Sequence, residues 1–371
     1  INGSKPVIVK APGLVAPDFT WETVTQMDFG FDASFLNNRL TGTFDWYRRN
    51  TKDMLVAGAT LPATLGASVP KSNSADMKTI GWELSLGWND RLENGFSYWV
   101  KGVLSDYQAT ITKYAGNDAG FYSQSDGDGK YYVGQKIGEI WGYHSNGLFQ
   151  SDDEAATIDQ SELYAGKWGA GDVKYEDLDN DGKITKGEET IYNPGDKSII
   201  GNKTPRYQFG ITVGFDYKNF DFEMFWQGTG KRDYMLSGAQ FWGFTSQWDV
   251  PYTPALDYWT ETNTDAYFPR PGWQNGGNRV TSDRYLQSAA YGRLKNLTVG
   301  YTIPKNLTTK WGISRLRLYV TGENLLTITP LNDAFDPETL GGMTYPINRK
   351  VAIGLNLIRI KSWIVRRIYG L

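Results

Sequence analysis

The sequence contains no cysteine and a single histidine, His144, in 371 residues. Disulfides and thiolate metal sites are therefore excluded, and a metal centre or catalytic triad built on histidine is not expected. No apolar run approaches the roughly 18 residues that a membrane helix requires. The formal net charge of -3 provides no basic field. We therefore expect no nucleic-acid partner.

Aromatic residues and glycine are instead abundant. Aromatics make up 15% of the chain, with 14 Trp and 23 Tyr, and Gly accounts for 42 residues. Both suit β-barrels, in which aromatic girdles lie at the membrane interfaces and small residues lie where strands bend. The low mean hydropathy of -0.47 does not argue against a barrel, because lumen residues dilute the apolar ones in every strand.

Alternation with period two is clearest in 208–227. Segment 208–217 alternates apolar residues with polar residues or glycine, and 220–227 does the same after Lys218 and Asn219. Two such runs joined by two residues predict a β-hairpin. One apolar and one polar face is typical of a barrel wall with lipid outside and water inside. The apolar set is Phe209, Ile211, Val213, Phe215, Tyr217, Phe220, Phe222, Met224 and Trp226.

The same pattern predicts nine strands, at 28–35, 40–47, 79–89, 96–107, 208–217, 220–227, 291–303, 315–323 and 350–357. Short turns follow the odd strands, and long connections such as 51–78, 108–205 and 231–290 follow the even ones. Outer-membrane barrels have this asymmetry, with short periplasmic turns and long external loops. A soluble β-sandwich also alternates, but it rarely has long loops on one side only. We predict an all-β, transmembrane antiparallel barrel.

Several stretches, in order, resemble the SusC/RagA family of TonB-dependent outer-membrane transporters. They are 133–150 (VGQKIGEIWGYHSNGLFQ), 171–182 (GDVKYEDLDNDG), 200–210 (IGNKTPRYQFG), 291–301 (YGRLKNLTVGY) and 316–325 (LRLYVTGENL). The resemblance covers most of 21–357. It implies a 22-stranded barrel in the outer membrane of a Gram-negative, Bacteroidota-like bacterium, of which 1–357 is the C-terminal part.

The resemblance also implies the partners. A plug domain, earlier strands and a TonB-contacting region are expected upstream, which agrees with nine strands that start outside, since complete bacterial barrels have an even number. A SusD-like surface lipoprotein is expected as a lid, with oligosaccharide or peptide as cargo and outer-membrane lipid around the wall. The basic, apolar segment 358–371 departs from the family pattern as an atypical tail.

We therefore expect TonB-dependent import of oligomeric nutrients and no enzymatic activity. The alternative is a calcium-stabilised surface adhesin or structural barrel without active transport. An upstream plug would separate the two, because an adhesin has no use for one.

The acidic segment 177–188 matches the calcium-loop pattern D-x-[DN]-x-[DN]-G-x5-E. Its expected oxygen donors are Asp177, Asp179, Asp181, the carbonyl of Lys183, Thr185 through water, and Glu188. Its flanks lack helical periodicity, so we predict a structural Ca²⁺ site within an external loop rather than a regulatory helix pair. The alternative is a solvated acidic turn.

The loop 231–290 is dense in aromatics, which can stack on sugar rings or bury peptide side chains. Candidate cargo or lid contacts are Trp242, Phe244, Trp248, Trp259 and Trp273; packing among themselves is the alternative.

Other polar residues favour structural roles. The acidic lumen residues Asp45, Glu83, Asp221 and Glu223 fit a solvated wall or plug contacts better than a catalytic carboxylate pair. Segment 151–154 (SDDE) predicts a capped short helix. His144 is expected to be structural, without a nucleophile beside it.

Overall fold

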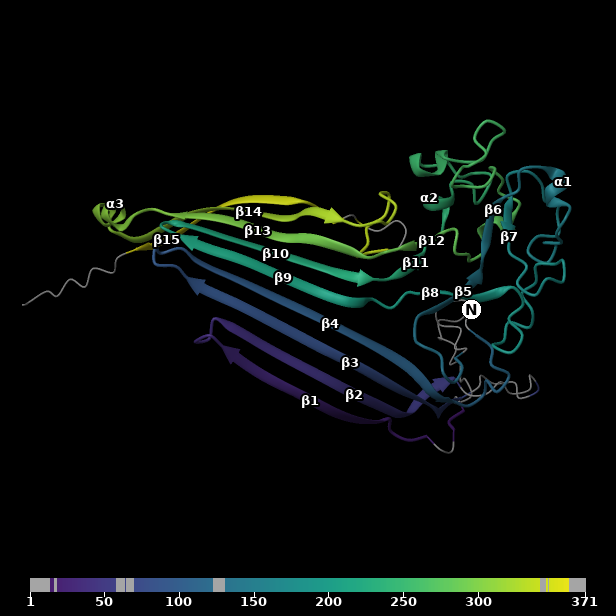
Figure 1. Cartoon of the computed structure of the whole chain (residues 1–371), viewed down its shortest axis with the longest axis horizontal. Coiled ribbons are helices and arrows are strands. Elements are labelled where there is room, and N and C mark those ends of the chain that lie inside the picture. The colour runs from purple at the N-terminus through teal and green to yellow at the C-terminus, as the bar shows by residue number, and fades with distance from the viewer. Residues whose placement is uncertain are drawn as a thin grey trace, which may run out of the picture.

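The computed structural model describes residues 14–16, 19–57, 64, 70–122, 131–340, 345 and 347–359. Its main feature is a nine-stranded antiparallel sheet in the order β1-β2-β3-β4-β9-β10-β13-β14-β15 (Figure 1). The strands are β1 Thr23–Phe35, β2 Leu40–Ala57, β3 Lys71–Arg91, β4 Ser97–Tyr114, β9 Arg206–Tyr217, β10 Phe220–Lys231, β13 Tyr291–Thr302, β14 Ile313–Ile328 and β15 Lys350–Arg359. All nine predicted strands are confirmed.

The short turns have the backbone geometry that the sequence implies. Lys218, with φ of 56°, turns β9 into β10 and brings Phe215 opposite Phe222. Asn37 and Asn38, with φ of 55° and 65°, turn β1 into β2. Asparagine tolerates this left-handed region better than most residues. These local choices set the register of each hairpin.

The connection expected at 51–78 is shorter than predicted. β2 continues to Ala57 and β3 begins at Lys71, with Ala57 opposite Lys71. The alternation fades there because loop residues around Tyr131 and Ile137 cover one face, where they pack against Ala75 and Ile111. The period-two alternation of apolar and polar residues depends on lipid on one face and water on the other. It is therefore absent from the parts of β2 and β3 that these loop residues cover.

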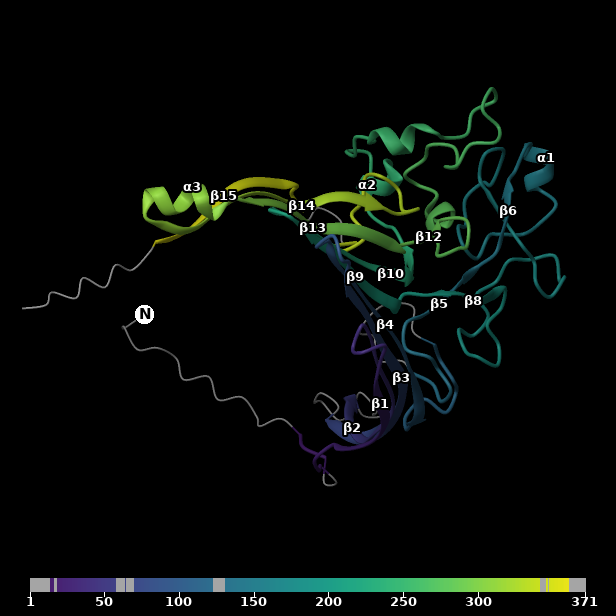
Figure 2. The same ribbon diagram turned by 60° about the vertical axis from the view of Figure 1, so that its left-hand side comes forward.

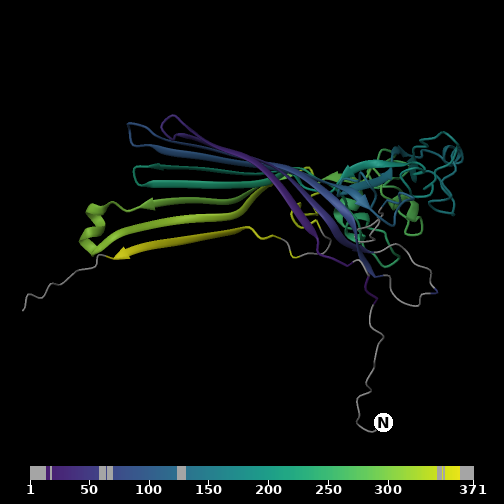
Figure 3. The same cartoon turned by 90° about the horizontal axis from the view of Figure 1, so that it is seen from below.

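The sheet bends into an open arc with β1 and β15 at its edges (Figures 2 and 3). On the polar face, aromatic rings lie over glycines of the next strand. A Cβ added at Gly81 would lie 2.4 Å from the ring of Tyr47, and one added at Gly214 would lie 2.1 Å from that of Trp99. Glycine at these positions allows the rings to lie flat on the wall.

The long connections gather at one end of the strands and fold into a compact external lobe, whereas the short turns lie at the other end (Figure 1). Its elements are β5 Glu139–Tyr143, β6 Ser145–Leu148, α1 Asp152–Ala155, β7 Val173–Tyr175, β8 Lys197–Asn202, β11 Asp233–Met235, α2 Ala239–Trp242, η2 Thr253–Leu256, η3 Gly276–Arg279 and β12 Leu286–Ser288. At the turn end, α3 Lys305–Thr308 and η4 Thr309–Trp311 link β13 to β14.

The external lobe has its own hydrophobic core, built from three connections. Tyr175 and Ile184 come from the β4–β9 connection, Phe241 and Tyr285 from the β10–β13 connection, and Phe335 from the β14–β15 connection. Four of these side chains are wholly buried, and Phe335 is 8% exposed. Within the described residues, no helix is long and apolar enough to cross a membrane.

Candidate functional site: the external lobe and the lumen wall

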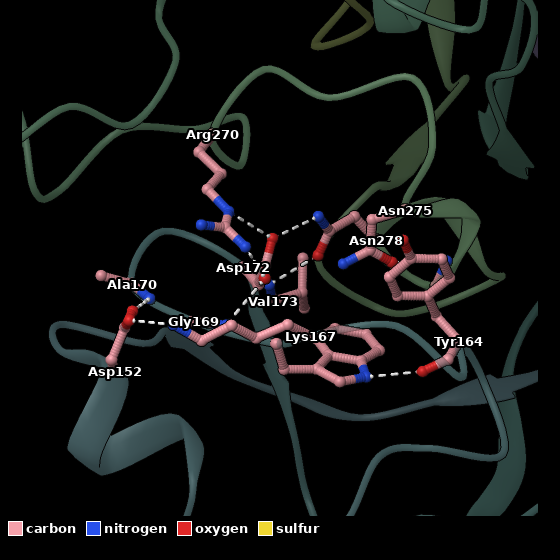
Figure 4. Close-up of polar contacts among 12 residues, drawn as sticks. Asp152, Tyr164, Lys167, Gly169, Ala170, Asp172, Val173, Arg270, Asn275 and Asn278 are labelled. Atoms are coloured by element: carbon pink, nitrogen blue, oxygen red, sulfur yellow. Dashed lines mark hydrogen bonds and ion pairs between the residues drawn. The ribbon is translucent and has the colours of Figure 1, made fainter.

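One buried carboxylate joins the first two connections of the external lobe. Asp172, just before β7, has no exposed surface. Its oxygens accept hydrogen bonds from Nε and Nη2 of Arg270 at 3.0 and 2.7 Å, from Nδ2 of Asn278 at 2.8 Å and from the backbone N–H of Gly169 at 3.0 Å (Figure 4). Asn278 in turn accepts the N–H of Val173 at 2.8 Å. These bonds hold the β4–β9 connection against the β10–β13 connection.

The predicted short helix lies beside this contact (Figure 4). Ser151 caps α1, and its Oγ accepts the N–H of Glu154 at 3.1 Å. The carboxylate of Glu154 accepts the N–H of Gln150 at 2.7 Å and pairs with Lys174 at 2.9 Å. The Gln150 N–H and then Lys174 lower the pKa of Glu154, although partial burial acts in the opposite direction. The predicted cap is confirmed.

The acidic loop is ordered by its own carboxylates. Asp177 accepts the backbone N–H groups of Asn180 at 2.7 Å and Gly182 at 2.8 Å, while Asn180 and Gly182 adopt positive φ. The loop is anchored to Asp159, whose N–H donates to the Gly182 carbonyl at 3.0 Å. Burial raises the pKa of Asp177, but the three backbone donors, led by Gly182, outweigh it and lower the pKa overall.

The carboxylates that converge are not all those of the sequence pattern. Oxygens of Asp177, Asp179 and Asp196 lie within 4.8 Å of one another, and they are the one such acidic group found among the described residues. Asp196 is 1% exposed and accepts the N–H groups of Leu178 and Thr185, each at 2.7 Å. Sequence analysis missed it because it lies beyond the pattern.

The remaining predicted ligands lie around this group. Asp181 accepts the N–H of Lys183 at 2.8 Å. The N–H of Thr185 donates to the carboxylate of Asp196, and the carbonyl of Thr185 accepts the backbone N–H of Asp196. Glu188 is exposed and stands outside the acidic group. Loss of water around Asp179, together with the charges of Asp181, Asp196 and Asp177, raises its pKa.

The three carboxylates suit a hard divalent cation. None of them takes part in an ion pair with any lysine or arginine in the described part of the chain. The group thus brings three negative charges together, and one of its carboxylates, Asp196, is buried with both oxygens oriented by backbone donors.

The five aromatic candidates separate into two groups. Trp248 is 84% exposed and Trp273 is 47% exposed. Trp242 is 8% exposed and packs edge-on against Tyr285 with ring centroids 4.5 Å apart. Trp259 packs against the core of the external lobe and has its Nε1 buried without a hydrogen-bond partner. Trp242 and Trp259 therefore follow the alternative of packing among the aromatics, whereas the exposed Trp248 and Trp273 stay candidates for cargo or lid contact.

Phe244 is half-buried at the rim of a small hollow. The other lining residues of this hollow include Tyr258, Phe268 and Arg270. The hollow thus brings two arginines, Arg270 and Arg279, together with several rings.

His144 has partners that the sequence did not reveal. Its Nδ1 lies 2.8 Å from Oδ2 of Asp283, and its Nε2 lies 2.7 Å from Oγ of Ser198. The N–H of Ser145 donates to the other oxygen of Asp283 at 2.9 Å. The sequence revealed no nucleophile–base pairing, and the contact between His144 and Ser198 appears only in the fold. The three residues join β8, the β5–β6 junction and the β10–β13 connection, which is a structural role.

The lumen wall carries the predicted acidic residues. Asp45 lies directly opposite Glu83 on β2 and β3, and both line a hollow of about 310 Å³. Asp221 pairs with Arg317 of β14, with Nε to Oδ1 at 2.9 Å. A second hollow of about 600 Å³ near the turns includes Asp221 and Glu223. The wall is polar and solvated, as expected.

Comparison with known proteins agrees with this architecture. Residues 6–325 match the family model described as TonB dependent receptor-like, beta-barrel. TonB-dependent receptor P3 of Formosa agariphila is 30% identical over 93% of this chain and 35% of its own length. TonB-dependent receptor SusC of Bacteroides thetaiotaomicron is 26% identical over 91% of this chain and 32% of its own length.

Solved structures show the same fold. The RagAB peptide transporter superposes with a TM-score of 0.70 at 22% identity, over 92% of this chain and 36% of that one. The chain thus spans about a third of the length of the relatives that it matches. With the family model matching most of its residues, the chain belongs to the TonB-dependent receptor β-barrels of the outer membrane.

Proposed function

We propose that the protein carrying this chain imports oligomeric nutrients across the outer membrane by TonB-dependent transport. The observation that carries the proposal is the combination of a polar-lined wall with an external lobe, fused from three long connections, at one end of it. A folded lobe at the mouth can bind large cargo, and the polar lumen can conduct it. The family and the likeness to SusC support the same activity.

The wall is part of a larger barrel in this proposal. Among the residues that the structure describes, β1 and β15 each pair with a single strand. Within a membrane an open sheet edge would leave backbone groups unsatisfied, so the wall must be closed by further strands. We infer that 1–357 forms the C-terminal part of a 22-stranded barrel, with earlier strands, a plug and the TonB-contacting region outside this chain.

The proposed cargo is an oligosaccharide or a peptide. The exposed rings of Trp248 and Trp273 offer flat apolar faces, which suit either class. The RagAB relative is a peptide transporter by its printed description. A SusD-like surface lipoprotein is the proposed lid over the external lobe.

We also propose that Ca²⁺ orders the acidic loop. Asp177, Asp179 and Asp196 would hold it, and their mutual repulsion would be relieved on binding. The role is structural, since the ion would fix a long connection against its conformational entropy.

An uptake assay in the native host tests the transport proposal. Fluorescent oligopeptides and oligosaccharides are offered to wild-type cells, to cells lacking this protein and to cells lacking TonB. Periplasmic accumulation of one cargo class in wild-type cells, lost in both mutants, is expected. An adhesin or purely structural barrel would give surface retention that does not depend on TonB, and that result would reject import.

A further inference from the structure

Two cations lie at the outer limit of the apolar face of the wall. On β2 this face is carried by alternate residues ending with Phe44 and Trp46, and the next position is Arg48. On β3 the corresponding series ends with Trp82 and Ile80, and the next position is Lys78. Both strands thus change from apolar to basic toward the same end, with Lys78 two residues beyond the partner of Arg48.

The register places these residues side by side. Trp46 lies opposite Trp82, Arg48 opposite Ile80, and Asn50 opposite Lys78. Arg48 and Lys78 are therefore diagonal neighbours on one face, at about 7–8 Å. Side chains of this length can contact a single phosphate group between them.

The level matches the outer boundary of the membrane. A rise of about 3.4 Å per residue and a tilt of about 40° place Arg48 about 20 Å above Leu40, which follows the β1–β2 turn. The apolar band of such barrels is about 25 Å tall. The long connections mark this end as external, so Arg48 and Lys78 lie near the outer end of this band, where long basic side chains reach the headgroups of the outer leaflet.

No carboxylate neutralises this pair. Neither cation forms an ion pair within the described part of the chain, and the Nε of Arg48 donates only to Oδ1 of Asn50 at 3.3 Å. Nearby acids are engaged elsewhere. Asp76 accepts the N–H of Asp53 at 2.9 Å, and Asp106 is paired with Arg206. Two cations without counterions on a lipid-facing surface need an anionic partner.

We propose that Arg48 and Lys78 form a binding site for the phosphate of an outer-leaflet lipid headgroup. Arginine binds phosphate through two parallel hydrogen bonds, and lysine adds a point charge. The neighbouring rings of Trp46 and Trp82 lie at the level where aromatic residues favour the interface. The site anchors β2 and β3 at a fixed height in the membrane, and it does not depend on which cargo the protein carries.

The chain provides a matched control in the adjacent residue. Arg49 faces the lumen, where its Nε donates to Oε1 of Gln26 at 3.0 Å. Arg48→Gln with Lys78→Gln removes the lipid-facing charges, and Arg49→Gln removes a cation of the same strand from the other face. Arg48→Lys with Lys78→Arg keeps both charges.

Native mass spectrometry of the whole protein, purified from outer membranes in detergent, measures the binding. Phosphatidic acid is titrated against phosphatidylcholine of equal chain length, with folding checked by heat-modifiable gel migration. We expect preferential phosphatidic acid binding that weakens about tenfold in the double Gln variant. Arg49→Gln and the charge-keeping variant should bind nearly as wild type.

Three results would overturn the proposal. One is equal binding of the two lipids, and another is a double Gln variant that binds phosphatidic acid like wild type. The third is full displacement of the lipid by millimolar inorganic phosphate, which would indicate a site for free anions rather than for lipid.

Discussion

The carboxylate of Asp172 and the guanidinium of Arg270 form a two-bond ion pair across two different connections, at 3.0 and 2.7 Å. Asp172 is fully buried, whereas the Arg270 side chain is 40% exposed. The pair therefore attaches the β10–β13 connection to the β4–β9 connection at the centre of the external lobe. Its loss should uncouple the two.

Asp172→Ala is expected to destabilise the external lobe by about 2–4 kcal/mol, below the full range for a buried pair because Arg270 is partly solvated. Hydrogen exchange of the Val173 amide, which Asn278 holds at 2.8 Å, is the measurement. Asp152→Asn is the control, since its ion pair with Lys167 is largely exposed. Equal exchange in the two variants would contradict the central role of Asp172.

The sequence pattern and the structure suggest different ligand sets for the acidic loop, and mutations can distinguish them. Asp196→Asn should weaken Ca²⁺ binding at least tenfold, because Asp196 supplies one of the three converging carboxylates. Glu188→Gln should have little effect, because that residue is exposed outside the group. Calorimetric titration of metal-free protein with Ca²⁺ measures both. Loss of binding in Glu188→Gln alone would restore the ligand set of the sequence pattern.

The two kinds of tryptophan predict opposite outcomes. Trp242→Ala should cost about 3–5 kcal/mol of stability in the external lobe, because it removes a buried ring that packs on Tyr285. Trp248→Ala should leave stability within about 0.5 kcal/mol and lower cargo or lid affinity. Hydrogen exchange reports the first effect, and binding of purified lipoprotein or labelled cargo reports the second. A Trp248→Ala variant with wild-type affinity for both would exclude that ring from recognition.

Replacing His144 tests whether this residue stabilises the junction or takes part in catalysis with Ser198. His144→Phe leaves Asp283 and Ser198 without their shared partner and should destabilise the junction by about 1–3 kcal/mol. Faster exchange of the Ser145 amide is the expected readout, since Asp283 accepts it. Hydrolysis of p-nitrophenyl acetate should stay at the background rate in wild type and in Ser198→Ala. A rate that fell on removing Ser198 would show that the group is catalytic.

The cap of α1 should respond to acid. The folded pKa of Glu154 is lowered, so its contribution to stability is present above the unfolded value of about 4.3 and is lost as pH falls through the folded pKa. Protection of the Gln150 amide, corrected for intrinsic exchange, should therefore decrease in strong acid. Glu154→Gln should show low protection at every pH. Protection of the wild type that stayed unchanged as the pH fell until Glu154 was fully protonated would contradict this.

Prediction from sequence worked where a feature is local. The alternation in 208–227 specified the β9–β10 hairpin, because lipid and water on opposite faces impose period two on each strand. The same reasoning located all nine strands but ended β2 too early and began β3 too late, since covered residues near Ala75 no longer separate lipid from water. The cap at Ser151 was also readable, because its partner is three residues away.

The amino-acid sequence by itself determined the wall, its hairpins and the family, since each rests on neighbouring residues and their order. Only the tertiary structure decided which distant groups meet. Asp196 joins Asp177, and Arg270 reaches Asp172 across 98 residues, because the connections fold on one shared core. Burial likewise assigned Trp242 to that core and left Trp248 in solvent. No local pattern encodes these contacts, since they depend on how three separate connections pack together.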